Sequence, residues 1–267
     1  MSVAIVLPAR LKSTRLPNKL LLHRSGKTLL EHSINRAKLA QAAYPKLFTT
    51  IRVACDDEQL LAAAKRAGVD AVMTDPNHPS GTDRIAEAAR DLNEEIIVNL
   101  QADEPEIEPA YVHAVAQLLT SGASGAEMGT LAAAICDEAT FRNPNVVKVV
   151  VDRPAGERPA SAIYFSRAPI PYSRDGQSYA GPGKHVFGLH HIGIYAYRHD
   201  FLNTFVTLPP SRLEQVEKLE QLRALEHGAT IRVALVPKHF PGIDTPEDYE
   251  AFLIREKSRS QEPRARS

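Results

Sequence analysis

Short apolar runs alternate with helical patterns through the first half of the chain, and this alternation restricts the possible folds more than any other feature. The apolar runs lie at residues 3–7, 48–54, 71–73 and 96–100. Between them, apolar residues recur at helical spacing over residues 29–41, 58–67, 82–93 and 109–119. This order predicts a mostly parallel sheet flanked by helices, in which ligands bind beyond the carboxyl ends of the strands.

A β-rich pattern replaces the alternation in the middle of the chain. Strand-like runs lie at residues 128–135, 146–152, 160–166 and 191–198, with a Pro-, Gly- and Ser-rich stretch at 167–184. They predict antiparallel strands or an arm that projects from the main sheet. Helical and strand patterns return at residues 213–226, 231–236 and 245–255. Thr245 and Pro246 suit the N-cap and the first position of the last helix.

These patterns predict an α/β fold with one domain over residues 1–255. We expect a smaller β-rich lobe roughly within residues 128–200 and a basic flexible tail at 256–267. A chain of 267 residues with 43% hydrophobic residues can bury a sizeable core. The two cysteines, Cys55 and Cys136, match no metal-binding spacing, and we expect free thiols in a reducing compartment.

Charge and hydropathy argue against two classes of partner. The formal net charge is zero, so the chain has no global field for nucleic acid or for a membrane surface. No uninterrupted apolar segment approaches the ~20 residues of a membrane span. Without a signal-like segment we expect a cytoplasmic protein. Any attraction for anions must therefore be local.

The loop after the first apolar run concentrates positive charge. Arg10, Arg15 and Lys19 lie within ten positions of one another. Arginine offers a planar fork for phosphate oxygens, and lysine offers a compact charge. The loop lacks the spacing of a Walker P-loop, so side chains as well as backbone would grip a nucleotide. At the carboxyl end of the first strand, this loop predicts a polyanion site.

Two acids fall where a magnesium site would need them. Asp103 follows the apolar run at residues 96–100, and one or two carboxylates with phosphates and water are the usual ligands of Mg²⁺. Asp244 precedes the helix at residues 245–255 and alone is most simply a helix-start acid. Paired in space with Asp103, it would complete a metal site. Glu104 is most simply an exposed turn residue.

Two further patterns suggest a nucleotide and a sugar. Ser80 opens a helix that carries Arg84 near its start, where backbone amides can meet an anion. Alternation along a strand puts His191 and Tyr195 on one face. Helix capping alone accounts for Ser80 but not for Arg84, and ordinary strand packing accounts for His191 and Tyr195. The remaining polar candidates lie on the helix at residues 213–226: Glu220 and Gln221.

Eight stretches taken together resemble one family, the 3-deoxy-manno-octulosonate (Kdo) cytidylyltransferases or CMP-Kdo synthetases. They are, in chain order, PARLKSTRLPNKLL, SGTDRIAEA, IVNLQADEPEIEP, NPNVVKVV, FSRAPIP, HIGIYAY, LEQLRAL and GIDTPEDYE. The resemblance implies a nucleotide-diphospho-sugar transferase fold, Rossmann-like, and a homodimer. It also implies a Mg²⁺-dependent reaction in which CTP and Kdo give CMP-Kdo and pyrophosphate, for lipopolysaccharide biosynthesis.

The resemblance also implies roles for individual residues. A catalytic set comprises Arg10, Lys19, Asp103 and Asp244, of which Asp103 and Asp244 would bind magnesium. Nucleotide binding would fall to Arg10, Ser13, Arg15, Lys19, Ser80, Arg84 and Gln101. The acid sugar would be bound by Arg167, His191, Tyr195, Glu220 and Gln221, with Arg167 as the partner of its carboxylate.

Two positions depart from the family pattern. Ala102 stands where glycine is usual, and its methyl group disfavours a positive φ angle. Asn18 replaces the glycine that usually precedes the lysine, and asparagine tolerates a left-handed backbone better than most residues. Neither change touches a charged group, so we expect activity to be retained.

Three alternatives remain open on the sequence. A sister enzyme would activate another acid sugar, such as 8-amino-Kdo or a sialic acid. A more distant relative would activate a sugar 1-phosphate with a nucleotide other than CTP. A regulatory nucleotide-binding module would keep the fold but would have lost catalysis. The presence of Arg10, Lys19, Asp103 and Asp244 argues against this alternative.

Overall fold

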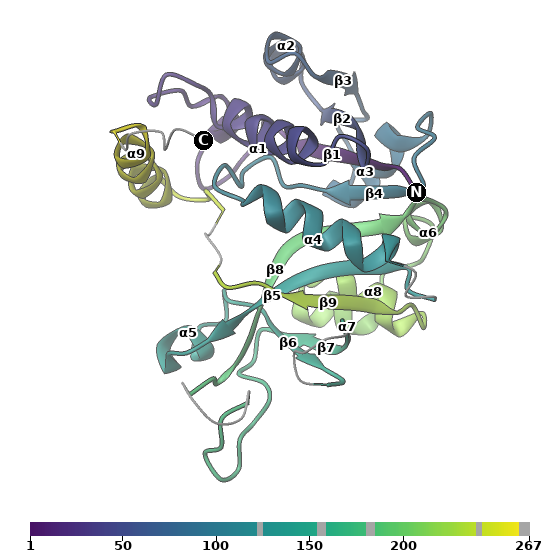
Figure 1. Cartoon of the computed structure of the whole chain (residues 1–267), viewed down its shortest axis with the longest axis vertical. Coiled ribbons are helices and arrows are strands. Elements are labelled where there is room, and N and C mark those ends of the chain that lie inside the picture. Colours follow the sequence, from purple (N-terminus) through teal and green to yellow (C-terminus); the bar gives the residue numbers. More distant parts are fainter. Residues whose placement is uncertain (122–124, 154–158, 180–184, 239–241, 262–267) are drawn as a thin grey trace. The chain divides into compact units, whose positions relative to one another are not determined.

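The computed structural model describes residues 1–121, 125–153, 159–179, 185–238 and 242–261. Contacts within the chain divide it into two compact units, whose elements are labelled in Figure 1. The first, which we call the β1 unit, contains Ile5–Leu92, Leu100–Pro109 and Phe240–Ser267. The second, which we call the β8 unit, contains Met1–Ala4, Asn93–Asn99 and Ala110–His239.

The strands of the β1 unit follow the order β3-β2-β1. They are β1 (Val3–Ala9), β2 (Phe48–Cys55) and β3 (Asp70–Met73). β2 and β3 pair in parallel, and every residue of β1 is buried. Burial of a whole strand requires an uninterrupted apolar sequence, as the run at the start of the chain has.

Four helices of this unit coincide with predicted helical patterns, and a short 3-10 helix, η1, lies in the loop after β1. They are η1 (Lys19–Leu21), α1 (Leu29–Ala43), α2 (Glu58–Arg66), α3 (Gly81–Ala89) and α9 (Pro246–Gln261). Thr28 and Glu31 form a capping box at the start of α1, which packs against α2 and β2. The hydroxyl of Ser80 accepts hydrogen bonds from the backbone N–H groups of Thr82 and Asp83 and so caps α3.

The strands of the β8 unit follow the order β4-β8-β5-β9-β7-β6. They are β4 (Ile96–Asn99), β5 (Met128–Ile135), β6 (Lys148–Val151), β7 (Ala160–Ser166), β8 (Gly188–Arg198) and β9 (Ile231–Leu235). β8 pairs antiparallel with β4, β5 and β6, and β6 pairs antiparallel with β7. The antiparallel strands expected in the middle of the chain are therefore confirmed. β5 and β9 pair in parallel.

Helices α4 and α6 pack on the strands of the β8 unit. The helices here are α4 (Pro109–Thr120), α5 (Glu138–Arg142), α6 (His199–Phe205), α7 (Arg212–Glu217) and α8 (Gln221–Glu226). α4 lies so close to β5 that a Cβ atom on Gly129 would stand 3.0 Å from the Cβ of Leu118. α6 contacts β8 and β4.

Two sequence expectations for helices are wrong in extent. The single helix predicted over residues 213–226 is two helices, because Lys218 adopts a left-handed backbone with φ 55° and ends α7. The tail predicted to be flexible from residue 256 is helical as far as Gln261, since α9 continues there. Residues 262–267 lie outside the described part of the chain.

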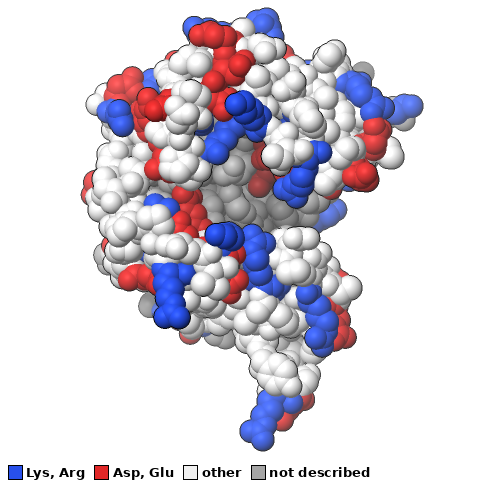
Figure 2. Space-filling model, turned by 180° about the vertical axis from the view of Figure 1, so that it is seen from behind, with Lys and Arg blue, Asp and Glu red and all other residues white. Residues whose placement is uncertain are grey.

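Charged side chains of both signs are interspersed on the face of the molecule seen in Figure 2. This distribution agrees with a formal net charge of zero. Within the described residues, no helix is both long and apolar enough to cross a membrane.

Candidate active site

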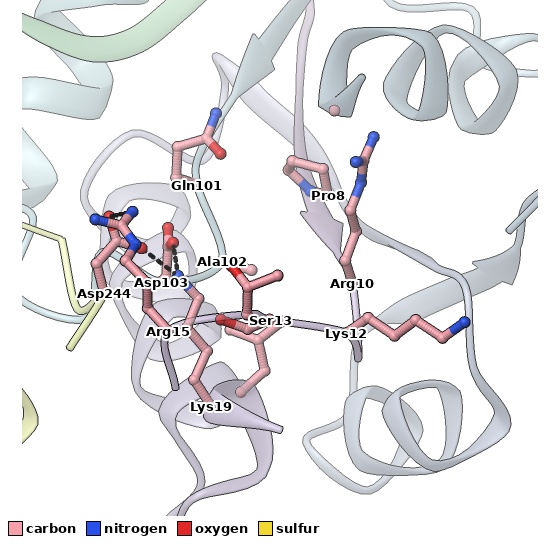
Figure 3. Close-up of a pocket in the computed structure, with 13 residues that line it drawn as sticks. Pro8, Arg10, Lys12, Ser13, Arg15, Lys19, Gln101, Ala102, Asp103 and Asp244 are labelled. Atoms are coloured by element: carbon pink, nitrogen blue, oxygen red, sulfur yellow. Dashed lines mark hydrogen bonds and ion pairs between the residues drawn. The ribbon is translucent and has the colours of Figure 1, made fainter. Parts of the chain in front are cut away.

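A pocket of about 390 Å³ opens at the carboxyl end of β1 in the β1 unit (Figure 3). The loop after β1 supplies most of its wall, and the end of β1, the start of α3, the segment after β4 and the approach to α9 supply the rest. Its lining residues are Pro8, Arg10, Lys12, Ser13, Thr14, Arg15, Lys19, Leu20, Gly81, Gln101, Ala102, Asp103 and Asp244. Seven of these residues are among those predicted from the sequence for the catalytic and nucleotide-binding sets: Arg10, Ser13, Arg15, Lys19, Gln101, Asp103 and Asp244.

Lys19 lies between the two candidate metal ligands. Its Nζ is 2.6 Å from Oδ2 of Asp103 and 2.7 Å from Oδ1 of Asp244. A third hydrogen bond of 3.0 Å runs from Nζ to the carbonyl oxygen of Ile243. Arg15 reaches the other oxygen of Asp244, with Nη2 2.7 Å from Oδ2. The pairing of Asp103 with Asp244, which sequence spacing alone leaves open, is thus present in the structure.

Backbone hydrogen bonds hold the two acidic segments together. The N–H of Ile243 donates to the carbonyl oxygen of Asp103 over 2.9 Å, so the residues before Asp244 are tied directly to Asp103. Behind them, Ser33 Oγ on α1 donates to the carbonyl oxygen of Ala102 over 2.7 Å. Thr245 Oγ1 accepts a hydrogen bond from the N–H of Asp248, which confirms Thr245 as the cap of α9.

Opposite charges set the protonation of this cluster. Burial opposes a charge on Lys19, but attraction to Asp103 and Asp244 outweighs it and raises the pKa of the ammonium. Burial likewise opposes ionisation of Asp244, yet Lys19 and Arg15 lower the pKa of its carboxyl. Glu104 is buried rather than exposed, contrary to expectation; burial and the charge of Asp103 raise its pKa to about 8.

The donor set at Lys19 is one that also suits a divalent cation. Two carboxylates converge on a single positive charge, and a carbonyl oxygen lies beside them. Among the described residues, no cluster of three or more His, Cys, Asp or Glu side chains forms a metal cage. Mg²⁺ commonly takes one or two carboxylates and leaves its other positions to phosphate and water, so Asp103 and Asp244 fit that ion.

Arg10 and Arg84 have different surroundings, although both were predicted to bind the nucleotide. Arg10 lines the pocket, and its Nη2 donates to the carbonyl oxygen of His78 over 3.2 Å. Arg84 is fully buried, and its guanidinium contacts Thr74 and, at 3.6 Å, Asp56. Burial lowers the pKa of Arg84. Arg84 is not one of the residues that line this pocket.

Ser80 uses its hydroxyl within α3. The oxygen accepts from two backbone N–H groups, and the hydroxyl donates to Oδ2 of Asp83 over 2.6 Å. Gly81, the next residue, is the one that lines the pocket. The capping role considered for Ser80 is therefore present, and a direct role toward a nucleotide stays a prediction.

Asp56 supports the pocket without lining it, and no motif marks it in the sequence. Its Oδ1 accepts a 2.8 Å hydrogen bond from the N–H of Leu11, while its Oδ2 faces Arg84. Asp56 follows the last residue of β2. The rule that ligands gather beyond the carboxyl ends of parallel strands would have selected it. The same rule applies to Lys12 and Thr14, which line the pocket from the loop after β1.

The five residues predicted to bind an acid sugar belong to the β8 unit. Arg167 follows β7, and its guanidinium bonds to three backbone carbonyl oxygens. Nε donates to Glu217 over 2.8 Å, Nη1 to Pro144 over 3.1 Å and Nη2 to Lys218 over 3.5 Å. A guanidinium carries five N–H groups, so these bonds do not exhaust it. Arg167 thus holds the end of α7 and retains donors for a carboxylate.

His191 and Tyr195 lie on one face of β8, as the alternation predicts. Their ring centroids are 5.5 Å apart. Nε2 of His191 is 3.0 Å from the hydroxyl of Thr130, and its ring lies edge-on to Phe165 at 4.9 Å. The Thr130 hydroxyl also bonds to carbonyl oxygens on either side of Gly193, where the β5–β8 pairing shifts register. His191 is therefore held rigidly.

Glu220 and Gln221 lie at the start of α8. Glu220 is the N-cap residue, and Gln221 is the first helical residue and is buried. The left-handed turn at Lys218 sets the direction in which α8 leaves α7. Arg167 bonds to the carbonyl oxygens of Glu217 and Lys218, so it contacts the turn that leads into Glu220 and Gln221.

A family model described as cytidylyltransferase matches residues 4–231. The chain belongs to the cytidylyltransferase family. Among curated relatives, the 3-deoxy-manno-octulosonate cytidylyltransferase of Syntrophobacter fumaroxidans is 45% identical over 256 residues, covering 95% of this chain and 96% of that protein. The 8-amino-3,8-dideoxy-manno-octulosonate cytidylyltransferase of Shewanella pealeana is 43% identical, covering 93% of this chain and 96% of that one.

A solved structure of CMP:2-keto-3-deoxy-manno-octonic acid synthetase complexed with CTP superimposes with a TM-score of 0.86. The two sequences are 37% identical, and the match covers 97% of this chain and 100% of the other. The predicted α/β fold of the nucleotide-diphospho-sugar transferases is confirmed by this likeness.

The two departures from the family pattern have different backbone conformations. Asn18 adopts the left-handed region with φ 53° and ψ 29°, as expected of a residue in the place of a glycine. Ala102 is not among the residues with positive φ, and its carbonyl oxygen bonds to Ser33. A negative φ at this position gives its methyl group no backbone penalty. Both changes fit the loop geometry that the pocket needs.

Proposed function

We propose that this chain is a cytidylyltransferase that activates Kdo: CTP and Kdo give CMP-Kdo and pyrophosphate. The observation that carries the proposal is the convergence of Asp103, Asp244, Lys19 and Arg15 in one pocket of a cytidylyltransferase fold. Relatives at 43–45% identity whose names specify Kdo or its 8-amino analogue support the choice of sugar class. The product is the activated sugar that lipopolysaccharide biosynthesis requires.

The reaction joins the anomeric oxygen of the sugar to the α-phosphorus of CTP and breaks the bond to pyrophosphate. Such phosphoryl transfer depends mainly on positioning and on neutralising charge. Arg10, Arg15 and Lys19 are the cations of the pocket that would bind the triphosphate. Mg²⁺, which we propose is required and held by Asp103 and Asp244, would offset phosphate charge. Lys19 is placed to exchange its carboxylate partners for phosphate oxygens.

The assay follows pyrophosphate release from purified protein with CTP, Mg²⁺ and a sugar acid. We expect release with Kdo, and none when EDTA removes the divalent cation. Parallel assays with 8-amino-Kdo and a sialic acid test the choice of sugar. Faster turnover with 8-amino-Kdo would assign this chain to the same class as the Shewanella pealeana relative. If none of the three acid sugars leads to pyrophosphate release, the proposal is contradicted.

We further propose a cytoplasmic homodimer that uses the β-rich lobe. Ile163 on β7 is 59% exposed and Tyr172, after β7, is 87% exposed, which are apolar or aromatic surfaces that a second copy would cover. Sedimentation of the wild type and of the double variant Ile163→Ser with Tyr172→Ser tests this. We expect a dimer for the wild type and a monomer for the variant.

A further inference from the structure

Lys148 is a fully buried lysine whose charge the proposed reaction does not use. It is the first residue of β6, and its side chain has 0% exposure. Its ammonium donates to three backbone carbonyl oxygens: Arg167 at 2.6 Å, Val146 at 2.7 Å and Asn143 at 3.1 Å. An ammonium has three N–H groups, so all of its donors are used.

The three acceptors are all backbone carbonyl oxygens, and none of them is a carboxylate. Burial and the positive charge of Arg167 accordingly lower the pKa of Lys148. A buried charge that bonds only to carbonyl groups, with the Glu217 carboxylate acting on it from beyond hydrogen-bond distance, is an unfavourable way to fill a core position. Instead of stabilising the core, the Lys148 ammonium orients three backbone carbonyl groups toward one position.

The carbonyls that Lys148 holds belong to two segments that meet at Arg167. Asn143 and Val146 lie on the loop after α5, and Arg167 follows β7. Arg167 binds back to the same loop through Nη1 and the carbonyl oxygen of Pro144 at 3.1 Å. The ammonium and the guanidinium therefore fasten the loop at residues 143–146 to the end of β7 from two sides.

The same framework reaches the other candidate sugar residues. Arg167 donates to the carbonyl oxygen of Glu217, and its N–H donates to the Glu217 carboxylate over 3.0 Å, so the end of α7 is fixed just before Glu220. On the opposite side, the N–H of His191 donates to the carbonyl oxygen of Val147, the residue before Lys148, over 2.9 Å. Lys148 thus lies at the junction between Arg167 and His191.

We infer that Lys148 is a positioning residue for the acid-sugar half of the reaction: by gathering three carbonyl groups, it sets the place from which the Arg167 guanidinium meets the sugar carboxylate. This inference rests on the proposed function. It assigns Lys148 no contact with the sugar. Loss of the ammonium should therefore impair use of the sugar and leave use of CTP nearly unchanged, because the CTP residues belong to the β1 unit.

The test compares Lys148→Met with wild type in full saturation kinetics for both substrates. Methionine fills a similar volume but donates no hydrogen bond. We expect KM for Kdo to rise about tenfold or more and KM for CTP to stay within about twofold. Arg198→Met is the matched control. Its Nε also donates to a backbone carbonyl oxygen of the β8 unit, that of Ala126 at 2.9 Å, but it lies at the other end of β8. We expect it to leave both KM values near wild type.

A folded Lys148→Met protein with an unchanged KM for Kdo overturns the inference, as does an equal loss for both substrates. If that variant fails to fold, Lys148→Gln replaces it, since glutamine can satisfy at most two of the three carbonyls. It should raise KM for Kdo about threefold, and an unchanged value overturns the inference. Wild-type assays come first: absence of turnover with Kdo, 8-amino-Kdo or a sialic acid refutes the proposed function itself. If the wild type turns over 8-amino-Kdo or a sialic acid instead of Kdo, KM of the variants is measured for that sugar.

Discussion

Each unit of the molecule contains a lysine whose three N–H groups are all bonded, and the two lysines differ in their acceptors. In the β1 unit, Lys19 bonds to two carboxylates and one carbonyl, and its pKa is raised. In the β8 unit, Lys148 bonds to three carbonyls, and its pKa is lowered. The first ammonium lines a pocket, whereas the second has no exposed surface.

The acceptors explain what each lysine can do. Carboxylate side chains can rotate away and accept other partners, so an ammonium between them can exchange them for the oxygens of a bound anion. Backbone carbonyls cannot leave without moving the chain. Lys19 is therefore suited to binding a ligand, whereas Lys148 is suited to fixing the backbone of the segments that it bonds to. Substitutions in each unit can test this contrast.

Asp103→Asn should have the largest effect. The substitution keeps the size of the side chain but removes the charge of one proposed metal ligand. We expect turnover to fall at least roughly a hundredfold, on the scale of ~3 kcal/mol for removing one strong electrostatic interaction from a transition state. Stability to urea should change little.

Asp70→Asn is the control, because Asp70 belongs to the same unit and pairs with Arg52 rather than with a pocket residue. It should keep normal turnover. Near-normal turnover of Asp103→Asn at saturating CTP and Mg²⁺ would remove Asp103 from the metal site.

Lys19→Met should mainly impair the use of CTP. The variant retains the apolar stem and leaves Asp103 and Asp244 without their shared cation. We expect kcat/KM for CTP to fall about thirtyfold or more, roughly 2 kcal/mol, while KM for Kdo changes much less. Lys38→Met is the control, since Lys38 donates to the backbone of Ala67 elsewhere in the unit. A defect confined to Kdo would assign the opening loop to the sugar.

Arg167→Lys should show the opposite selectivity. Lysine cannot reproduce a bidentate contact with a carboxylate, and it cannot bond to the same three carbonyls around Pro144 and Glu217. We expect KM for Kdo to rise about tenfold, or about 1.4 kcal/mol, with CTP binding by calorimetry close to wild type. Arg198→Lys in the same unit should be neutral. If Kdo saturation is unchanged, Arg167 does not hold the carboxylate.

His190→Gln tests the cost of burying positive charge near Lys148, measured as stability rather than as turnover. Burial first, and then the charge of Lys148, lowers the pKa of His190 from 6.5 to about 4. Because the folded pKa lies below the unfolded one, this contribution to stability is complete above pH 6.5 and is lost as the pH falls toward 4.

The wild type should therefore lose about 2 kcal/mol more stability than His190→Gln between pH 7 and pH 5. Urea unfolding of both proteins at the two pH values measures the difference. Parallel losses in the two proteins would show that His190 is not titrating in this range.

The pocket of the β1 unit could be predicted from the sequence, whereas the framework of the β8 unit could not. Arg10, Lys19 and Asp103 each follow the carboxyl end of a strand or lie on the loop after it, so one general rule brings them together. Asn18 also behaved as its chemistry predicts, with a left-handed backbone. These inferences depend on local sequence and on strand order alone.

The helix break at Lys218 illustrates what local sequence misses. Residues 213–226 have helical spacing throughout, and lysine is an ordinary helix former. The break is held by Arg167, which lies 50 positions earlier and bonds to the carbonyl of Glu217. Sequence patterns also do not predict the three hydrogen bonds from Lys148 to carbonyl oxygens, because a lysine at the start of a strand is usually exposed to solvent. Tertiary contacts overrode propensity at both positions.

The hydrogen bond between Ile243 and Asp103 has a consequence for the order in which the protein matures. Lys19 leaves the ribosome before Asp244, which follows 225 positions later. Until then, a nascent chain can form β1, β2 and β3 but has only one of the two carboxylates. Closing so long a loop is among the slower steps of folding. The proposed metal site, which needs both carboxylates, can therefore form only after Asp244 has been synthesised.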